Sequence, residues 1–592
     1  MSDATAESPA ARRRRRAGRI SAWVLGGILV LSLAALAWIG IRAALAYQHL
    51  DAARAAATDA GTVLADPASA PELIATVSTH TAAARDLTGD PVWALAEQLP
   101  WVGPQLSAVS TVAATLDDVA TTALVPLSSV AATFSLDSIR PTDGAIDLAA
   151  FTELESAASA AATALGTADS DLAGIDRTAL LGPVSSAVDQ VAELVHDAYG
   201  SVDTLSRTAT LLPAMLGRDD PRDYLIVFQN NAEWRSLGGI VGAMVLVHAE
   251  GGRVTLADQA STGDFPTYAE PVVELSDEQI RIFGTQPATF VQNVTQIPDF
   301  TRDGPIMQAM WQREKGMTVD GVLSIDPVAL SYLLRATGPV TLGNGVQLTS
   351  DNAVQVLLNQ VYIDYEDPRV QDAIFASAAA AVFDAITGGR LDPSVFVSAL
   401  ATAGTENRLL LWNADAEEQA VLDGTALQGS LDTAEDVTQF GIYANDATSS
   451  KMDFYMQLDS GAAWCGSDAA LTVTLRNTAP ADAAQLPDYL TGGGTHGVPP
   501  GEVETMVYVY LPVDGVLTST TSTPMADTTV FGGGEDAGRQ VLTWRTRLAP
   551  GEEVTLDLRV RAPRTETIAV RSTPTVHALV TEGFAPTCGN PE

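Results

Sequence analysis

The longest uninterrupted apolar run of the chain covers residues 20–41. These 22 residues carry no charge, and a helix of this length can cross a hydrocarbon core of about 30 Å. Arg12–Arg16 and Arg19 precede the run, whereas only Arg42 follows it closely. Because positive charge stays on the cytoplasmic side of a membrane, the pattern predicts one span with residues 43–592 outside the cell membrane.

A cleaved signal peptide is the alternative explanation of this run. The apolar part of a signal peptide is usually about 7–15 residues long and is followed by a small-residue cleavage site. The run here is longer, and Trp23 and Trp38 lie toward its two ends, as interfacial anchors do. We therefore expect an uncleaved transmembrane helix preceded by a cytoplasmic basic tail, residues 1–19.

Helical spacing dominates residues 43–215. Apolar residues three and four positions apart form one stripe of an amphipathic helix after Pro183, and a weaker stripe begins at Phe151. The two stripes are Val184, Val188, Val191, Val195, Val202 and Leu205, and Phe151, Leu154, Ala158 and Leu165. The pattern predicts an α-helical stalk or bundle.

The pattern changes after residue 219, where short runs rich in β-branched residues alternate with helical stretches. Strands are predicted at 224–228, 239–247, 254–256, 322–325 and 408–412, and helices at 327–336, 350–359, 370–387 and 393–403. This mixture predicts a central α/β domain over residues 219–425.

Helical patterns disappear after residue 451. The chain then carries short β-rich runs at 454–458, 471–476, 506–511, 541–545, 554–561 and 568–571. Glycine triplets at 492–494 and 532–534 are interpreted as turns between them. Several short strands with such punctuation predict a β-sandwich, so that residues 426–592 form a β-rich C-terminal domain.

Composition narrows the classes of function. Apolar residues make up 46% of the chain, which excludes general disorder. The formal net charge of −39 repels nucleic acid, so we expect no nucleic-acid partner. Solubility is the ordinary explanation of such a charge; the alternative is that acidic loops collect divalent cations.

The chain has two cysteines, Cys465 and Cys588. In an oxidising compartment two such residues usually pair. A metal site would need further histidine or cysteine ligands at short spacing, and the sequence has none near them. We expect a disulfide that ties the two ends of the C-terminal domain together.

Common catalytic signatures are missing from the sequence. The histidines are scattered without an H-E-x-x-H arrangement, and there is neither a G-x-S-x-G elbow nor a G-x-x-x-x-G-K phosphate loop. The catalytic residues of this chain, if it has any, are therefore unknown from motifs.

The densest candidate site is the polar segment 229–239, which follows a predicted strand. Amides and an arginine beside glycines can hold a phosphate or a sugar, because the guanidinium offers a fork and glycines let backbone N–H groups approach. The candidate ligand-binding residues are Asn230, Asn231, Glu233, Arg235, Gly238 and Gly239. The alternative is a polar turn that only shapes the backbone.

A second candidate opens a predicted helix near residue 368. Asp364, Glu366 and Asp367 could bind a divalent cation, and Arg369 could face an anion. Alternatively, they are acidic residues of the kind that a helix dipole favours at its N-terminus.

Four motifs resemble a known bacterial family. Residues 229–239 (QNNAEWRSLGG), 319–328 (VDGVLSIDPV), 336–340 (ATGPV) and 451–455 (KMDFY) are similar to the membrane-anchored family of domain of unknown function 4012. The order of span, Ala-rich helices, central domain and β-rich tail also fits that family. The resemblance covers most of the chain but implies no activity by itself.

A more distant similarity is to the LytR-CpsA-Psr enzymes. They transfer glycopolymers from polyprenyl-pyrophosphate lipids to the cell wall with Mg²⁺. Their Arg-x-Asp-Thr and Pro-Arg-Asp motifs have no counterpart here at 240–243 and 260–264. Arg235 and Asp264 are the nearest candidate replacements. The similarity implies Mg²⁺ or another divalent cation, with Asp264 as an added candidate ligand.

Two functions follow as expectations. The first is an extracytoplasmic envelope protein that assembles or attaches surface glycopolymers through a polyprenyl-pyrophosphate-linked glycan or cell-wall polymer, either as a divergent phosphotransferase or as a binding protein. The competing function is a noncatalytic cell-envelope scaffold. Convergence of Arg235 and Arg369 on one pocket would favour the first, and their separation would favour the second.

Overall fold

The structure is a computed structural model, which describes residues 9–59, 70–131, 139–142, 144–431, 437–525, 528–578, 586 and 588. The first eight residues of the predicted cytoplasmic tail lie outside this part. The chain forms two compact units, Met1–Ser135 with Ala149–Thr210, and Leu136–Leu148 with Leu211–Glu592.

The first unit is helical, which confirms the prediction for the N-terminal region. Its helices are α1 (Pro9–Asp59), α2 (Ala70–Thr88), α3 (Pro91–Ala96), α4 (Gly103–Val119), a π-helical turn η3 (Ala120–Leu124), α5 (Val125–Ala131), α6 (Ala149–Ala173) and α7 (Gly182–Met215). The predicted stripes meet in one core, where Leu165 of α6 and Val188 and Val195 of α7 pack with Val112 of α4. Phe151 and Leu154 of α6 are buried as well.

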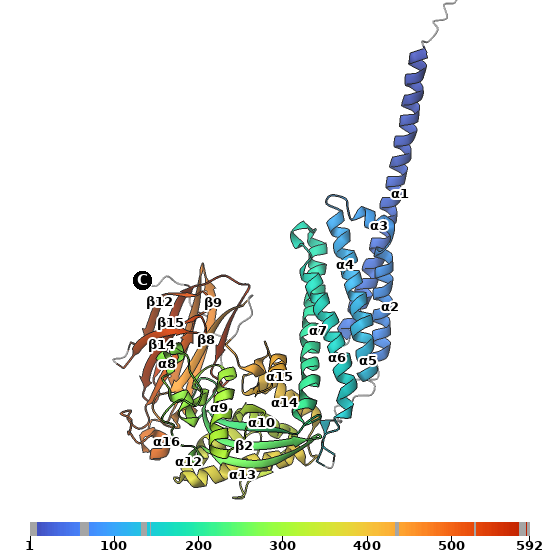
Figure 1. The fold of residues 1–592 in the computed structure, drawn as a ribbon. Helices are drawn as coiled ribbons and strands as arrows, with labels where there is room; N and C mark the ends of the chain where they lie inside the picture. Colours follow the sequence, from blue (N-terminus) through green and yellow to red (C-terminus); the bar gives the residue numbers. More distant parts are fainter. Residues whose placement is uncertain are drawn as a thin grey trace, which may run out of the picture. The chain divides into compact units, whose positions relative to one another are not determined.

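Helix α1 is long, and its apolar stretch extends beyond the other helices (Figure 1). Ile20, Trp23 and Leu31 are 64%, 81% and 71% exposed. By length and composition, three helical stretches in the described residues are apolar enough to cross a membrane: Arg19–Ala56, Gly103–Val130 and Pro368–Thr387. The first has none of its apolar window buried, whereas the other two bury 39% and 33% of theirs against the protein.

The second unit begins with a mixed five-stranded sheet in the order β3-β2-β1-β4-β7. Its strands are β1 (Arg222–Asn230), β2 (Ile240–Glu250), β3 (Arg253–Ser261), β4 (Gly321–Ile325) and β7 (Leu409–Asn413). β1 and β4 are parallel, and the other neighbours are antiparallel. Gly251 and Gly252 have φ of 54° and 83° in the β2–β3 turn, a region that glycine tolerates best.

Helices cover both faces of this sheet, because side chains of a strand alternate between its faces. Leu225 and Val227 contact α9 (Phe300–Lys315) in one core. Ile226 and Phe228 pack on the other face, against the helices α10 (Pro327–Thr337), α13 (Pro368–Thr387) and α14 (Pro393–Thr405).

Two further sheets follow, in the orders β12-β15-β10-β9 and β13-β14-β11-β8-β16. Their strands are β8 (Val437–Asp446), β9 (Met456–Cys465), β10 (Asp468–Asn477), β11 (Val503–Tyr510), β12 (Val516–Thr523), β13 (Val530–Asp536), β14 (Arg539–Leu548), β15 (Glu553–Arg561) and β16 (Thr567–Ser572). Leu471, Val473 and Leu556 of the first sheet share a core with Ile442 and Val507 of the second.

The central sheet and the C-terminal sheets also share a core. Tyr443 and Tyr510 pack in the same cluster as Met307 of α9 and Leu225 of β1. The structure therefore places the predicted central and C-terminal domains within a single compact unit.

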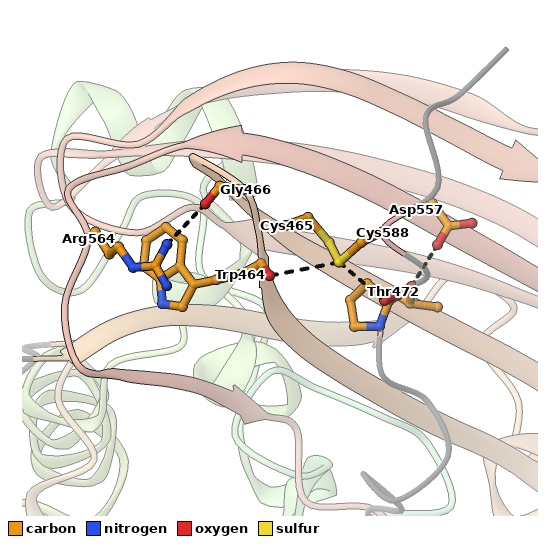
Figure 2. The surroundings of a disulfide bond; sticks show 8 residues. Trp464, Cys465, Gly466, Thr472, Asp557, Arg564 and Cys588 are labelled. Atoms are coloured by element: carbon orange, nitrogen blue, oxygen red, sulfur yellow. Dashed lines mark hydrogen bonds between the residues drawn. A yellow bond between two sulfur atoms is a disulfide. The ribbon is translucent and has the colours of Figure 1, made fainter.

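The predicted disulfide between Cys465 and Cys588 is present (Figure 2). Cys465 ends β9, and Cys588 lies after the last strand, 123 residues later. Beside the bond, the Arg564 guanidinium carbon lies 5.2 Å from the centroid of the Trp464 ring, and the guanidinium donates a hydrogen bond to the Gly466 carbonyl (Figure 2). The bond therefore ties the C-terminal tail to the end of one sheet.

Replacing Cys588 with serine should lower the free energy of unfolding of the second unit by about 2 kcal/mol, because the reduced chain regains the entropy of an open loop. The helical unit should be unaffected. Thermal unfolding of the full chain measures this, together with thiol alkylation of the unreduced wild type. Two freely alkylated thiols in the native wild type would contradict the pairing.

One buried carboxylate of the second unit has no hydrogen-bond partner among the described residues. Asp303 of α9 is fully buried, and neither of its carboxylate oxygens accepts a hydrogen bond from any described residue. Burial and the neighbouring Asp299 raise its pKa well above the ordinary value, against a smaller opposite effect of Arg302. The folded state therefore keeps a proton on Asp303 that the unfolded chain releases above its ordinary pKa.

Replacing Asp303 with asparagine should raise stability at pH 7. Because the folded pKa is raised, the aspartate's stability contribution is complete below the unfolded pKa and decreases as pH rises toward the folded pKa. The gain should be about 1–3 kcal/mol at pH 7 and should vanish near pH 3. Thermal unfolding against pH tests this, with exposed Asp220→Asn as the control. An equal effect at both pH values would show that charge is not the cause.

Candidate functional site

The predicted ligand-binding segment 229–239 connects β1 to β2 and is mostly buried. Gln229 closes the turn: its side-chain amide donates to the Ser324 hydroxyl at 2.6 Å, and its Oε1 accepts from the Gly239 N–H at 2.9 Å. Gly238 has φ of 136°, and a Cβ on Gly239 would lie 2.1 Å from the Asn230 carbonyl oxygen. The two glycines are thus required by close approach within the protein.

The side chains of the two asparagines of the segment also form hydrogen bonds within the protein. The Asn230 amide donates to the Tyr362 hydroxyl, and its Oδ1 accepts from the Ala232 N–H at 3.1 Å. The Asn231 amide donates to Asp326 Oδ2 at 3.1 Å and to the Pro574 carbonyl at 2.9 Å. Asn231 therefore joins the central sheet to the end of the C-terminal region.

Glu233 and Arg235 belong to a buried ionic network. Glu233 accepts from the Lys451 ammonium and, at 3.2 Å, from Arg235 Nη2. Arg235 also donates to Asn293 Oδ1 at 2.8 and 2.9 Å and to the Trp234 carbonyl at 2.7 Å. Burial raises the pKa of Glu233, but the two cations lower it more, so the carboxylate is charged at neutral pH.

Two aspartates complete the network. Asp453 Oδ2 accepts from the Trp234 N–H at 2.7 Å, and burial with the nearby Asp446 raises the pKa of Asp453 well above its ordinary value. Burial and Glu233 raise the pKa of Asp446 to about 6, although Arg235 and two backbone N–H groups oppose the shift. Burial thus disfavours the charged form of Asp453, which accepts a backbone hydrogen bond within the protein.

A second buried ion pair lies beside the first. Arg408 Nη1 is 2.7 Å from Asp326 Oδ2, and the two side chains are 5% and 2% exposed. Asp326 also accepts from the Ala329 N–H at 2.8 Å and so caps α10. Arg408 Nη2 donates to the Thr575 carbonyl at 2.8 Å. Residues 229–239, Asp326 and residues 451–453 thus meet in one polar contact region, called here the junction.

Arg369 is placed differently from Arg235. Its side chain is 90% exposed at the start of α13 and pairs with Asp367, with Nη2 3.1 Å from Oδ2. The two arginines share no hydrogen-bond partner in the described part of the chain. The prediction that both hold one anionic ligand gains no support from this geometry, because Arg235 is engaged inside the protein and Arg369 faces solvent.

The predicted cation ligands do not converge. Asp367 caps α13, Asp364 accepts from the Gln360 amide at 2.7 Å, and Glu366 is exposed. Asp264 accepts from the Ser261 N–H at 3.0 Å in a capping turn after β3. Within the described residues, no group of three or more His, Cys, Asp or Glu side chains could hold a metal. Local capping accounts for Asp367 and Asp264.

A hollow of about 230 Å³ lies between β2, β3 and α13. Its lining is mostly apolar, with Asp264 and Asp372 as its carboxylates. Burial raises the pKa of Asp372, and Asp264 raises it further, while a hydrogen bond from Ser261 lowers it. Asp264 is thus a predicted site residue that borders a hollow.

Three of the four motif segments that carried the predicted family resemblance contribute residues to the junction, namely 229–239, 319–328 and 451–455. Residues 219–362 match the family model described as "Protein of unknown function (DUF4012)". This match confirms the predicted resemblance over those residues. No curated protein matches the chain significantly.

A comparison with solved structures finds a chain described as the transcriptional regulator yvhJ from Bacillus subtilis. It is 10% identical, with a TM-score of 0.20, and the alignment covers 36% of this chain and 78% of that one. A similarity this low carries no argument about fold or function. The predicted similarity to the LytR-CpsA-Psr enzymes is not confirmed by these comparisons.

Sequence reasoning did not anticipate a second cavity, of about 620 Å³. Arg408, Arg571, Glu406, Asn407 and His577 are among its lining residues. The Arg571 guanidinium donates to Asn407 Oδ1 at 2.8 Å, across 164 positions of sequence. These residues belong to turns and strand ends that form no local motif, so no sequence signal grouped them.

Proposed function

We propose that this protein is a membrane-anchored, noncatalytic scaffold of the cell envelope, held by α1 and working outside the membrane. The observation that carries the proposal is the junction. Most polar groups of residues 229–239 that could have formed a ligand site are instead engaged in contacts that hold the central sheet to the C-terminal sheets. Asn231 Oδ1 is the exception in this segment, with no partner among the described residues. A scaffold needs such rigidity, whereas a transferase needs free polar groups.

The anchor is supported by exposure and charge. The apolar residues of 20–41 face outward from α1, and a water-soluble surface rarely carries an apolar patch of this size. The arginine-rich residues before the run favour a cytoplasmic N-terminus. A disulfide in the C-terminal region agrees with an extracytoplasmic compartment.

This orientation predicts a labelling pattern in intact cells. The chain has only the two paired cysteines, so an introduced cysteine is the single free thiol. Ser201→Cys, on the exposed side of α7, should react with a membrane-impermeant maleimide in intact cells. Ser2→Cys should react only after permeabilisation. The reverse pattern would overturn the assigned topology.

The junction argues against pyrophosphate binding by Arg235. Four hydrogen bonds, one of which is the ion pair to Glu233, occupy its guanidinium, and each would have to break before a ligand could take its place. A buried hydrogen-bonding group left without its partner costs about 1–3 kcal/mol. A ligand would have to offset several such losses before any net affinity remained.

The test is binding of a short-chain polyprenyl pyrophosphate by the full chain in nanodiscs, with and without Mg²⁺. The scaffold proposal expects neither saturable binding nor release of pyrophosphate or phosphate. Arg369→Ala and Arg235→Ala should leave this result unchanged. Saturable binding that either substitution weakens about tenfold or more would replace the scaffold by a glycolipid-binding or transferase function, since tenfold corresponds to about 1.4 kcal/mol.

A second candidate, glycolipid binding, is favoured by the hollow beside Asp264. Its apolar walls suit an isoprenoid chain, and Asp264 with Asp372 could hold a divalent cation that neutralises a phosphate. In the same nanodisc assay this candidate expects Mg²⁺-dependent binding that Asp372→Asn abolishes and Arg235→Lys does not. Binding that does not depend on Mg²⁺ would reject it.

A further inference from the structure

The connection between α3 and α4 exposes an unusual number of large apolar side chains. Leu95 is 68%, Leu99 49% and Trp101 90% exposed, and Val92 and Val102 are exposed as well. We call residues 91–103 the apolar tip. Its single charged side chain is Glu97, which accepts a hydrogen bond from the Ser110 hydroxyl. Such a surface is unfavourable against water and requires an occupant.

The apolar tip lies beside the end of the apolar stretch of α1. Arg42 Nε is 2.9 Å from Asp90 Oδ2, and the same guanidinium donates to the carbonyls of Asp86 and Leu87 at 2.7 and 2.8 Å. Trp38 Nε1 is 3.4 Å from Asp90 Oδ2. Figure 1 shows α3 next to α1 where α1 leaves the other helices.

Apolar packing also holds the tip beside the end of the apolar stretch of α1. Trp93 and Leu106 are buried against Ile39 and Ala43 of α1. Residues 20–41 span about 33 Å as a helix at 1.5 Å per residue, close to the thickness of a hydrocarbon core. Residues 38–43 therefore coincide with the end of the span, and the tip is held at that level.

A second connection reaches the same end of the bundle. Gln105, at the start of α4, donates to the Ala179 carbonyl at 2.8 Å and accepts from the Leu181 N–H at 2.9 Å. Leu181, between α6 and α7, is 64% exposed. Two inter-helix connections thus present apolar side chains beside the end of one apolar helix.

We propose that the apolar tip and Leu181 are embedded in the interfacial layer of the bilayer that α1 crosses, so that the helical unit rests on the membrane. This inference rests on the anchoring part of the proposed function. Trp101 suits the position, because tryptophan is enriched at membrane interfaces. It has φ of 67°, an uncommon conformation for a bulky residue, and its ring is almost fully exposed.

The net charge of the chain determines how the tip can contact the bilayer. The acidic chain is repelled by anionic headgroups, so attraction by lysine and arginine clusters cannot hold it to the surface. An uncharged tip that buries leucine and tryptophan in the interface needs no such attraction. The occupant is therefore the apolar-to-polar boundary of the bilayer.

The test uses single cysteines in the otherwise thiol-free full chain, reconstituted in phosphatidylcholine vesicles. An environment-sensitive fluorophore is attached to Trp101→Cys or Leu95→Cys, and lipids carrying a quencher at a shallow acyl position are added. We expect a blue-shifted emission and strong quenching at both positions. Ser201→Cys, about 28 Å along α7 from Gly182, should show neither.

A label at Leu31→Cys, in the middle of the span, distinguishes a failure of the membrane anchor from a failure of the proposed contact between the apolar tip and the bilayer. If the Leu31 label is quenched by deep acyl quenchers while both tip labels behave like Ser201, the anchor holds and the inference is wrong. If the Leu31 label is itself unquenched, the anchoring part of the proposed function fails. Tip labels shielded from lipid but blue-shifted would indicate a protein partner on the tip and would also overturn the inference.

Discussion

Replacing Arg235 with alanine should lower the free energy of unfolding of the second unit by about 3–5 kcal/mol, whereas Arg369→Ala should leave it unchanged within error. Removing one partner of a buried ion pair leaves an uncompensated charge. Arg235→Ala takes one of two cations from Glu233 and also removes the donors to Asn293 and the Trp234 carbonyl. Arg369 is exposed and contacts a helix-capping aspartate two residues away.

Chemical denaturation of the full chain in detergent measures both variants. Arg235→Lys should recover only part of the loss, because an ammonium keeps the charge but cannot reproduce the bonds of a planar fork. If Arg235→Ala and Arg369→Ala were equally mild, the junction would not stabilise the unit. The scaffold proposal would then lose its main support.

Local patterns predicted many of the elements well. Residues 224–228 lie within β1, and the predicted helix at 327–336 is α10 with one residue added. Both contain runs of apolar residues with a clear start signal, such as the Asp326-Pro327 pair that caps and opens α10. These elements are decided by neighbours in sequence, so one sequence is enough to find them.

Two C-terminal elements show where the pattern fails. The prediction of a turn at residues 532–534 was wrong, because these glycines lie inside β13. A Cβ on Gly533 would lie 2.8 Å from the Val541 carbonyl oxygen, so glycine is needed by a close strand neighbour. Strand β8 was missed, although Phe440, Ile442 and Ala444 alternate toward one core as a strand requires.

The junction could be found only in part from the sequence. Residues 229–239 were identified as chemically dense, but their function depends on partners far away along the chain. Glu233 meets Lys451 across 218 positions, and Asn231 meets the Pro574 carbonyl across 343. A polar segment that binds a ligand and one that binds its own protein have the same local composition, so only the fold distinguishes them.

The last prediction concerns Lys451, one of two lysines in the chain. Lys451→Met should destabilise the second unit by about 3–5 kcal/mol, because the methionine fills a similar volume but leaves Glu233 buried beside Arg235 alone. Lys315→Met is the matched control. Its ammonium lies 3.8 Å from Asp258 Oδ2 on a partly exposed surface, where an ion pair contributes about 0–1 kcal/mol.

The pH dependence and a double variant give this prediction a sharper form. The pKa of Glu233 is lowered in the folded state, so its stability contribution is present above the ordinary glutamate pKa and is lost as pH falls through the folded pKa. The difference between wild type and Lys451→Met should therefore persist at neutral pH and shrink in acid. Lys451→Met with Glu233→Gln should recover part of the loss, since no buried carboxylate remains without its lysine. A double variant as unstable as the sum of the two single variants would show that the two side chains are not coupled.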